Sequence, residues 1–211
     1  MPLLEHAIRD FFFLWATIDP IGTLVIFAAL TKRKASEDKK KVAMKSCLYA
    51  LAVLLGAILA GQIILSGMGI RMISFQVAGG LILLLFAMQM IFSNFSGADS
   101  DPEKGHDIAV FPLAIPAIAT PGAIMAAIIL TDNNMYTFIE QAVTACMLVG
   151  VLICTYAMMR ASDAILKLIG QNGASILIKV MGMLLAALSI ELIMEAVGID
   201  AWMNPPQASL Q

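Results

Sequence analysis

Six long apolar runs dominate this sequence and leave few choices of fold. Each has about 20 residues, the length that an α-helix needs to cross the hydrocarbon of a bilayer. The runs cover residues 11–31, 42–65, 74–92, 110–130, 138–159 and 174–197. Only 13% of the 211 residues are charged, compared with about 25% in soluble domains. The sequence therefore predicts an all-α membrane protein with six transmembrane helices.

The placement of lysine and arginine predicts the orientation of these helices. Of the 13 Lys and Arg residues, 11 fall on the side of the first loop, which leaves Arg9 and Arg71 on the other side. Cytoplasmic loops carry an excess of Lys and Arg. We therefore expect the basic loop 32–45 to be cytoplasmic and both termini to lie outside. Residues 160–173 alternate between apolar and polar and are expected to extend the fifth helix along the membrane interface.

The two halves of the chain resemble each other. Equivalent positions recur at nearly constant spacing: Gly22 and Gly122, Thr31 and Thr131, Gly80 and Gly182, Gln89 and Glu191. Because each half has three crossings, an odd number, the second half must enter the membrane from the opposite side. This arrangement is an inverted-topology repeat, which many secondary transporters use. The alternative is a chance likeness between apolar helices.

The repeat predicts how the chain is divided. Residues 1–92 form a first three-helix repeat, 93–109 a cytoplasmic linker, 110–198 a second, inverted three-helix repeat, and 199–211 a short polar tail.

Two helix-start signals lie inside membrane-length runs. "DPIG" at 19–22 interrupts the first run, and "TPG" at 120–122 interrupts the fourth. Asp and Thr are favoured N-caps, Pro is favoured as the first helical residue, and the residue before Pro is disfavoured in helices. We therefore expect helices 1 and 4 to be broken near the membrane midplane. The alternative is a pair of proline-kinked structural helices that bind no ligand.

Paired breaks of this kind predict a binding site. They expose backbone N–H groups at positive helix ends, which suit a carboxylate, and glycine lets a ligand or a backbone come close. The candidate substrate-binding residues are Asp19, Pro20, Gly22, Thr23, Thr120, Pro121, Gly122, Ala123, Gln89 and Glu191. Asp19 and Glu191 are also candidates for proton or ion coupling, because ionisable residues deep in a membrane are costly and usually functional.

The roles of the three polar side chains remain open at this level. Asp19 could cap its helix, contact an ammonium group or carry a proton. Gln89 and Glu191 could line a shared cavity, or they could join helices by hydrogen bonds. The chain has no nucleophile motif, Walker loop, zinc pattern or basic face with interleaved aromatics. No enzyme activity, metal, cofactor or nucleic-acid partner is therefore expected.

Several motifs together resemble one known family. "DPIGTLVIF", "FPLAIPAIATPGAI" and "MGMLLAALSIELIMEAVG" are similar to the MarC family of bacterial inner-membrane proteins, and the likeness covers nearly the whole chain. The resemblance implies six membrane helices in an inverted repeat. It also implies transport, because a member is described as a transporter of small neutral amino acids such as glycine and alanine.

These features predict a secondary transporter or exporter of small neutral amino acids or similar zwitterions, coupled to an ion or proton and working by alternating access. The alternative function is a membrane channel or pore for a small solute or ion, because broken helices also line selectivity filters. The expected location is the bacterial inner membrane. The expected partners are a small-molecule substrate, the lipid bilayer and a possible second copy of the chain.

Overall fold

A computed structural model describes residues 2–32, 34–92 and 107–198, and these residues form helices and short connections without any strand. The elements are α1 (Pro2–Ile18), α2 (Pro20–Thr31), α3 (Ser36–Gly67), α4 (Met72–Phe92), η1 (Ala109–Ile118), α5 (Pro121–Ile129), α6 (Phe138–Arg160) and α7 (Ser162–Val197). The predicted linker lies outside the described residues except for 107–109, and the predicted tail lies wholly outside them.

Five spans in this part of the chain are long and apolar enough to cross a membrane, and six if η1 and α5 count as one span bent by 56°. Large apolar side chains such as Leu59, Ile63 and Leu85 are exposed on the outer faces of the helices. A surface of this kind is stable against hydrocarbon rather than water. The prediction of an all-helical membrane protein is confirmed.

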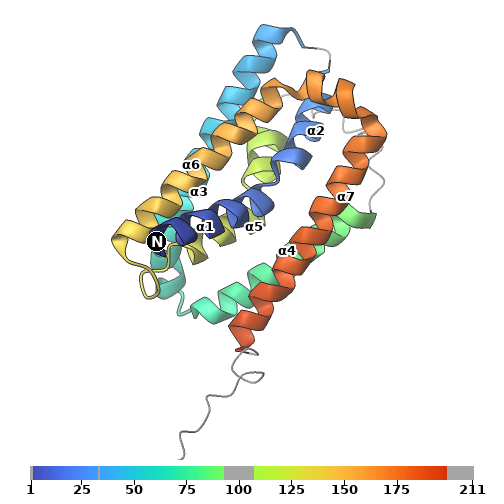
Figure 1. The fold of residues 1–211 in the computed structure, drawn as a ribbon. Helices are drawn as coiled ribbons and strands as arrows, with labels where there is room; N and C mark the ends of the chain where they lie inside the picture. The colour runs from blue at the N-terminus through green and yellow to red at the C-terminus, as the bar shows by residue number, and fades with distance from the viewer. Residues whose placement is uncertain (1, 33, 93–106, 199–211) are drawn as a thin grey trace, which may run out of the picture.

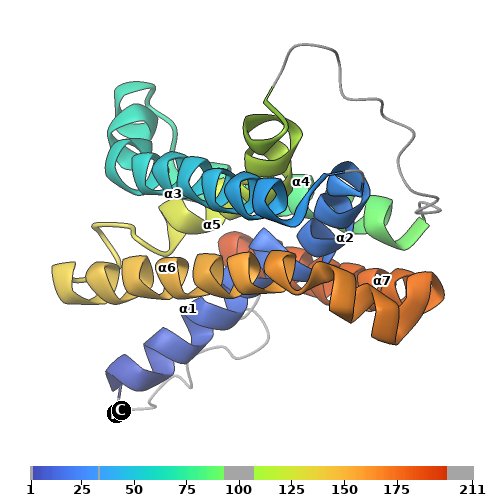
Figure 2. The same cartoon turned by 90° about the horizontal axis from the view of Figure 1, so that it is seen from above.

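Helices from the first half of the chain pack against helices from the second half. α4 and α7 lie side by side along much of their length (Figure 1). α3 packs on α6, α1 on α5 and α2 on η1. Seen from above, α2 and α5 lie between α3 on one side and α6 and α7 on the other (Figure 2). The two broken segments therefore occupy the middle of the molecule.

Capping groups fix several helix ends at the surface. α6 begins with a capping box, in which the Thr137 hydroxyl accepts a hydrogen bond from the Glu140 N–H while the Glu140 carboxylate accepts one from the Thr137 N–H. Such reciprocal bonds satisfy N–H groups that have no partner within the helix. Ahead of η1, the Asp107 carboxylate accepts a hydrogen bond from the Ala109 N–H at 3.1 Å and lies 3.3 Å from Lys45 Nζ. Both contacts lower the pKa of Asp107.

Two boundaries differ from the sequence prediction. The first helix begins at Pro2, well before the apolar run at residue 11, and its Asp10 forms a buried hydrogen bond to Thr144 of α6. Residues 162–169 belong to α7 instead of extending α6. α6 ends before Ala161, and α7 is interrupted at Gly170, whose positive φ of 65° is readily adopted only by glycine. The prediction that this stretch continues the fifth helix is wrong.

Glycines allow the close approach of α4 and α7. A Cβ added to Gly80 would lie 2.6 Å from Ile193 Cγ1 and 3.1 Å from the Ser189 carbonyl oxygen of α7. A Cβ added to Gly182 would lie 3.2 Å from the Ala87 carbonyl oxygen of α4. Small residues at such an interface let two membrane helices pack backbone to backbone.

We expect Gly80→Val to lower the unfolding free energy by about 1–3 kcal/mol, because the added methyl groups would force α4 away from the α7 backbone. Gly56→Val in α3 is the matched control, since a Cβ at Gly56 meets no atom within 4 Å. Thermal unfolding of the purified variants in detergent measures the difference. Equal melting temperatures for the two variants would contradict this account of the interface.

Candidate functional site

The first helix break is built around Asp19. Asp19 alone separates α1 from α2, and its backbone is left-handed, with φ 50° and ψ 72°. Among residues with a Cβ, Asp and Asn adopt this conformation most readily. The Asp19 carboxylate turns back over the first turn of α2 and accepts a hydrogen bond from the Gly22 N–H at 3.1 Å. A Cβ at Gly22 would collide with that carboxylate, so the glycine of the DPIG motif makes room for the cap.

The second break is capped by a hydroxyl group instead of a carboxylate. Thr120 has extended backbone angles, φ −65° and ψ 157°, and its hydroxyl accepts a hydrogen bond from the Ala123 N–H at 2.9 Å. Pro121 follows as the first residue of α5. A Cβ at Gly122 would collide with the Leu83 side chain of α4, so this glycine allows α5 to pack closely on α4.

The caps and the first helical hydrogen bonds use several of the N–H groups that were predicted from the sequence as donors to a ligand carboxylate. In addition to Gly22 and Ala123, the N–H groups of Thr23 and Ile124 bond to the carbonyl oxygens of Asp19 and Thr120, each at 3.0 Å. These four donors are satisfied within the breaks. A carboxylate bound here would therefore need other donors.

Two threonine hydroxyls connect the breaks to each other. Thr120 Oγ1 donates to the Thr17 carbonyl oxygen at 2.8 Å, and Thr23 Oγ1 donates to the Ala117 carbonyl oxygen at 3.0 Å. Thr17 lies in the last turn of α1, where carbonyl groups lack partners within the helix. The residue four positions after Ala117 is Pro121, which has no N–H to donate. Each hydroxyl thus satisfies a carbonyl oxygen that the opposite break leaves unpaired.

We expect Thr120→Val to lower the unfolding free energy by about 2 kcal/mol. The change removes a helix cap, worth about 1 kcal/mol, and leaves the buried Thr17 carbonyl oxygen without its donor. Thr120→Ser keeps the hydroxyl and serves as the control, with an expected loss below about 1 kcal/mol. Unfolding titrations in mixed micelles would measure both variants. A valine variant as stable as the serine variant would show that the hydroxyl bonds contribute nothing.

A cavity of about 230 Å³ lies beside the first break. Its polar lining comes from Asp19, Thr23 and Gln89, and Gly22 and Ala117 also line it. The rest of the wall consists of apolar side chains from α2, the last two turns of α4 and the prolines of η1. The volume is below the roughly 300–1,000 Å³ of sites for drug-sized ligands, so it suits a molecule of a few heavy atoms.

The structure brings together only part of the predicted site. Asp19, Gly22, Thr23 and Gln89 line the cavity. Pro20, Thr120, Gly122 and Ala123 are buried in the two breaks and do not line it, while Pro121 is exposed. Glu191 lies exposed on the surface of α7 and is absent from the cavity wall. The structure therefore does not join Glu191 to Asp19 in one cavity.

Comparison with known proteins identifies the family. The sequence profile described as "MarC family integral membrane protein" matches residues 4–202. The chain belongs to the MarC family. The resemblance read from its motifs is thereby confirmed, and the chain is a multi-pass membrane protein.

Relatives of this MarC family chain come from bacteria and archaea. A UPF0056 membrane protein of Buchnera aphidicola subsp. Schizaphis graminum is 30% identical over 196 residues, covering 92% of each chain. The UPF0056 inner membrane protein YhgN of Escherichia coli is 31% identical over 189 residues, covering 89% of this chain and 92% of the relative. A UPF0056 membrane protein of Methanocaldococcus jannaschii is 30% identical and covers 92% and 97%. No solved structure matches.

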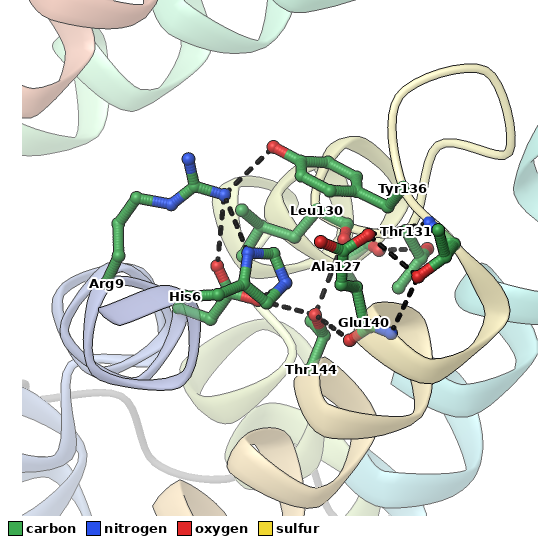
Figure 3. Close-up of polar contacts among 10 residues, drawn as sticks. His6, Arg9, Ala127, Leu130, Thr131, Tyr136, Glu140 and Thr144 are labelled. Carbon is green, nitrogen blue, oxygen red and sulfur yellow. Dashed lines mark hydrogen bonds and ion pairs between the residues drawn. The ribbon is translucent and has the colours of Figure 1, made fainter. Parts of the chain in front are cut away.

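A second polar cluster, at the opposite end of α1, was missed by reading the sequence. Asp10 is fully buried and accepts a hydrogen bond from the Thr144 hydroxyl of α6. His6 Nε2 lies 3.1 Å and Arg9 Nη2 3.5 Å from the Asp10 carboxylate, and Arg9 also donates to the Tyr136 hydroxyl at 2.9 Å. Figure 3 shows α1 side chains converging on α6 and on the connection after α5. The cluster joins the start of the first half of this MarC family chain to the middle of the second.

One signal in the sequence could have found part of this cluster. His6 and Asp10 are four residues apart, the spacing that places two side chains on one face of a helix. Their contact with Tyr136 and Thr144 depends on how α1 docks, which local spacing does not specify. Within the described residues, no group of three or more His, Cys, Asp or Glu side chains is placed to hold a metal ion.

Proposed function

We propose that the chain is a secondary transporter of small neutral amino acids or similar zwitterions, and that it works by alternating access. The observation that carries the proposal is the cavity beside two cross-bonded helix breaks, which holds a buried carboxylate, a hydroxyl and an amide. Discontinuous helices that meet around a small polar site are typical of secondary transporters. The family member described as a transporter of small neutral amino acids supports the same class of substrate.

The proposed substrate contacts follow from the polar lining of the cavity. The Asp19 carboxylate would face the substrate ammonium group, because charge-assisted hydrogen bonds are the strongest available there. The Gln89 amide can donate to the substrate carboxylate, a role that the capped N–H groups of α2 and α5 leave open. Asp19 is also the proposed coupling group, since Glu191 lies away from the cavity.

We also propose that residues 1–92 and 110–198 are inverted repeats. The packing of α4 on α7 and of α3 on α6 supports this proposal, as does the reciprocal packing of Gly80 and Gly182. The two carbonyl acceptors, Thr17 and Ala117, are 100 residues apart, the same spacing that separates Gly22 from Gly122. Rocking of one repeat against the other around the breaks, which we place near the membrane midplane, would expose the site to each side in turn.

The proposed orientation puts the basic loop 32–45 in the cytoplasm of a bacterial cell and both termini outside. In this orientation the cavity extends from the first break toward the cytoplasm, because its wall runs from Asp19 and the first two turns of α2 to the last two turns of α4. The Asp10 cluster would close the outer side. Labelling of single cysteines placed at Lys40 and Asn133 in intact cells tests this: Asn133→Cys should react with an impermeant reagent and Lys40→Cys should not.

Transport in proteoliposomes tests the function itself. Purified protein should exchange labelled glycine or alanine against an internal pool of the unlabelled amino acid, with a rate that saturates as the external concentration rises. Protein-free vesicles give the background. Flux that grows linearly with concentration, together with conductance steps in planar bilayers, would instead indicate a pore. If no small zwitterion moves above the background, the proposed function is wrong.

A further inference from the structure

A second, larger cavity lies at the end of the molecule where α2 meets α3 and α7 begins. Its volume is about 430 Å³, and α2, α3 and α7 all contribute to its wall. Figure 1 shows the connection from α2 to α3 and the start of α7 at the same end of the molecule. The proposed transport site does not use this cavity, because the two share no lining residue.

The charged lining of this cavity has an excess of positive charge. Lys39 Nζ donates to both oxygens of the Asp163 carboxylate, at 2.9 and 2.7 Å, and its side chain is only 18% exposed. Lys32 and Lys167 also line the cavity, and neither forms an ion pair within the described residues. Because the Lys39–Asp163 pair is neutral as a unit, two lysines remain to attract an anion.

The remaining wall is apolar. Val25, Ala28 and Ala29 form it on α2, and Leu166, Ala174 and Ile178 form it on α7. The alanines leave space beside α2 that larger side chains would fill. The Ser175 hydroxyl lies in the same wall. A ligand that fits must therefore combine an anionic group with an apolar body.

We propose that this cavity binds an anionic phospholipid, with its phosphate between Lys32 and Lys167 and its apolar part against α2 and α7. Basic pockets between membrane helices at the cytoplasmic end are suited to lipid headgroups. The cavity lies at the end of the membrane-spanning part of α2, where lipid phosphates are found. A free phosphate ion would share the lysine contacts but would leave the apolar wall unused. The bound lipid would hold α2, the helix that Asp19 caps, against α7.

Lipid binding to the purified full-length chain tests the proposal. Native mass spectrometry would compare phosphatidylglycerol with phosphatidylcholine of the same acyl chains. We expect the wild type to prefer phosphatidylglycerol by at least about 10-fold, because each lysine near the headgroup contributes to the attraction. Lys32→Gln combined with Lys167→Gln should abolish most of this preference.

The matched control removes the same charge elsewhere. Lys40 and Lys41 are exposed on α3 at the same end and do not line the cavity, so Lys40→Gln with Lys41→Gln should keep the preference. An equal loss in both double variants would overturn the proposal, because it would show only a general attraction to basic loops.

Two further measurements make the result independent of folding and of the lipid's source. Ala28→Leu fills the apolar wall without changing charge and should also weaken phosphatidylglycerol binding. Inorganic phosphate at millimolar concentration should not displace the lipid. Displacement by phosphate, or full binding by the Ala28→Leu variant, would show that the apolar wall plays no part and would overturn the lipid assignment. Neither outcome depends on amino-acid transport.

Discussion

Asp19→Asn is expected to fold normally and to lose transport by about 10- to 100-fold. Asparagine tolerates the left-handed backbone of residue 19 and is as good an N-cap as aspartate, so the bond to the Gly22 N–H should survive. What disappears is the negative charge beside the cavity, and a hydrogen bond to a charged group contributes about 1.5–3 kcal/mol. Initial rates of alanine exchange, measured beside the melting temperature, separate the two effects.

Asp19→Ala is the comparison that isolates the cap. Alanine can neither accept from Gly22 nor adopt φ 50° without strain, so this variant should lose about 1–2 kcal/mol of stability as well as transport. If Asp19→Asn exchanges alanine at the wild-type rate and with the wild-type pH profile, Asp19 is a helix cap alone. In that case neither substrate binding nor coupling depends on its charge.

Asp10→Ala is expected to cause the largest loss of stability, about 3–5 kcal/mol. The Asp10 carboxylate is fully buried and has three partners, His6, Arg9 and Thr144. Removing one member of a buried network leaves its partners without compensation, which costs more than the interaction itself contributed. Unfolding titrations in mixed micelles would measure the loss. The loss of stability should not depend on whether the protein transports a substrate.

Arg9→Ala is the matched control for this prediction. The Arg9 side chain is 55% exposed and lies 3.5 Å from the same carboxylate, and exposed ion pairs contribute about 0–1 kcal/mol. Its loss should therefore be small. Thr144→Val, which removes the buried donor but keeps the shape of the side chain, should fall between the two. If Arg9→Ala is as unstable as Asp10→Ala, the exposed Arg9–Asp10 ion pair stabilises the protein and the buried contacts of Asp10 do not. That result would contradict the prediction.

The local chemistry of the two breaks could be read from the sequence, but the surroundings of their glycines could not. Asp or Thr before Pro favours a helix start, so the starts of α2 and α5 were predictable from three residues each. Gly22 and Gly122 were expected to let a ligand approach. The structure gives each a different neighbour, the Asp19 carboxylate in one case and the Leu83 side chain in the other. These contacts depend on rotamers and on helix packing.

Residues outside the two breaks show the same limit. Glu191 was predicted to be the repeat partner of Gln89, yet Gln89 lines the cavity and Glu191 does not. The direction in which each side chain points depends on how α4 and α7 pack on their neighbours, which the local sequence does not specify. Asp10 was overlooked because it precedes the first apolar run. Its burial comes from the docking of α1 against α6, which the local sequence does not show.

The crossed hydroxyl bonds have a mechanical consequence. Thr120 holds the end of α1, and Thr23 holds the end of η1, so the two halves are pinned where their interrupted helices meet. Two halves that are joined at the centre can rotate relative to each other more easily than they can separate. A small rotation about the centre produces the largest displacement at the ends of the molecule. The two hydroxyl groups would then mark the point about which the two halves rotate. Motion could open one end while the Asp10 cluster at the other end bears the strain, without the central bonds ever breaking.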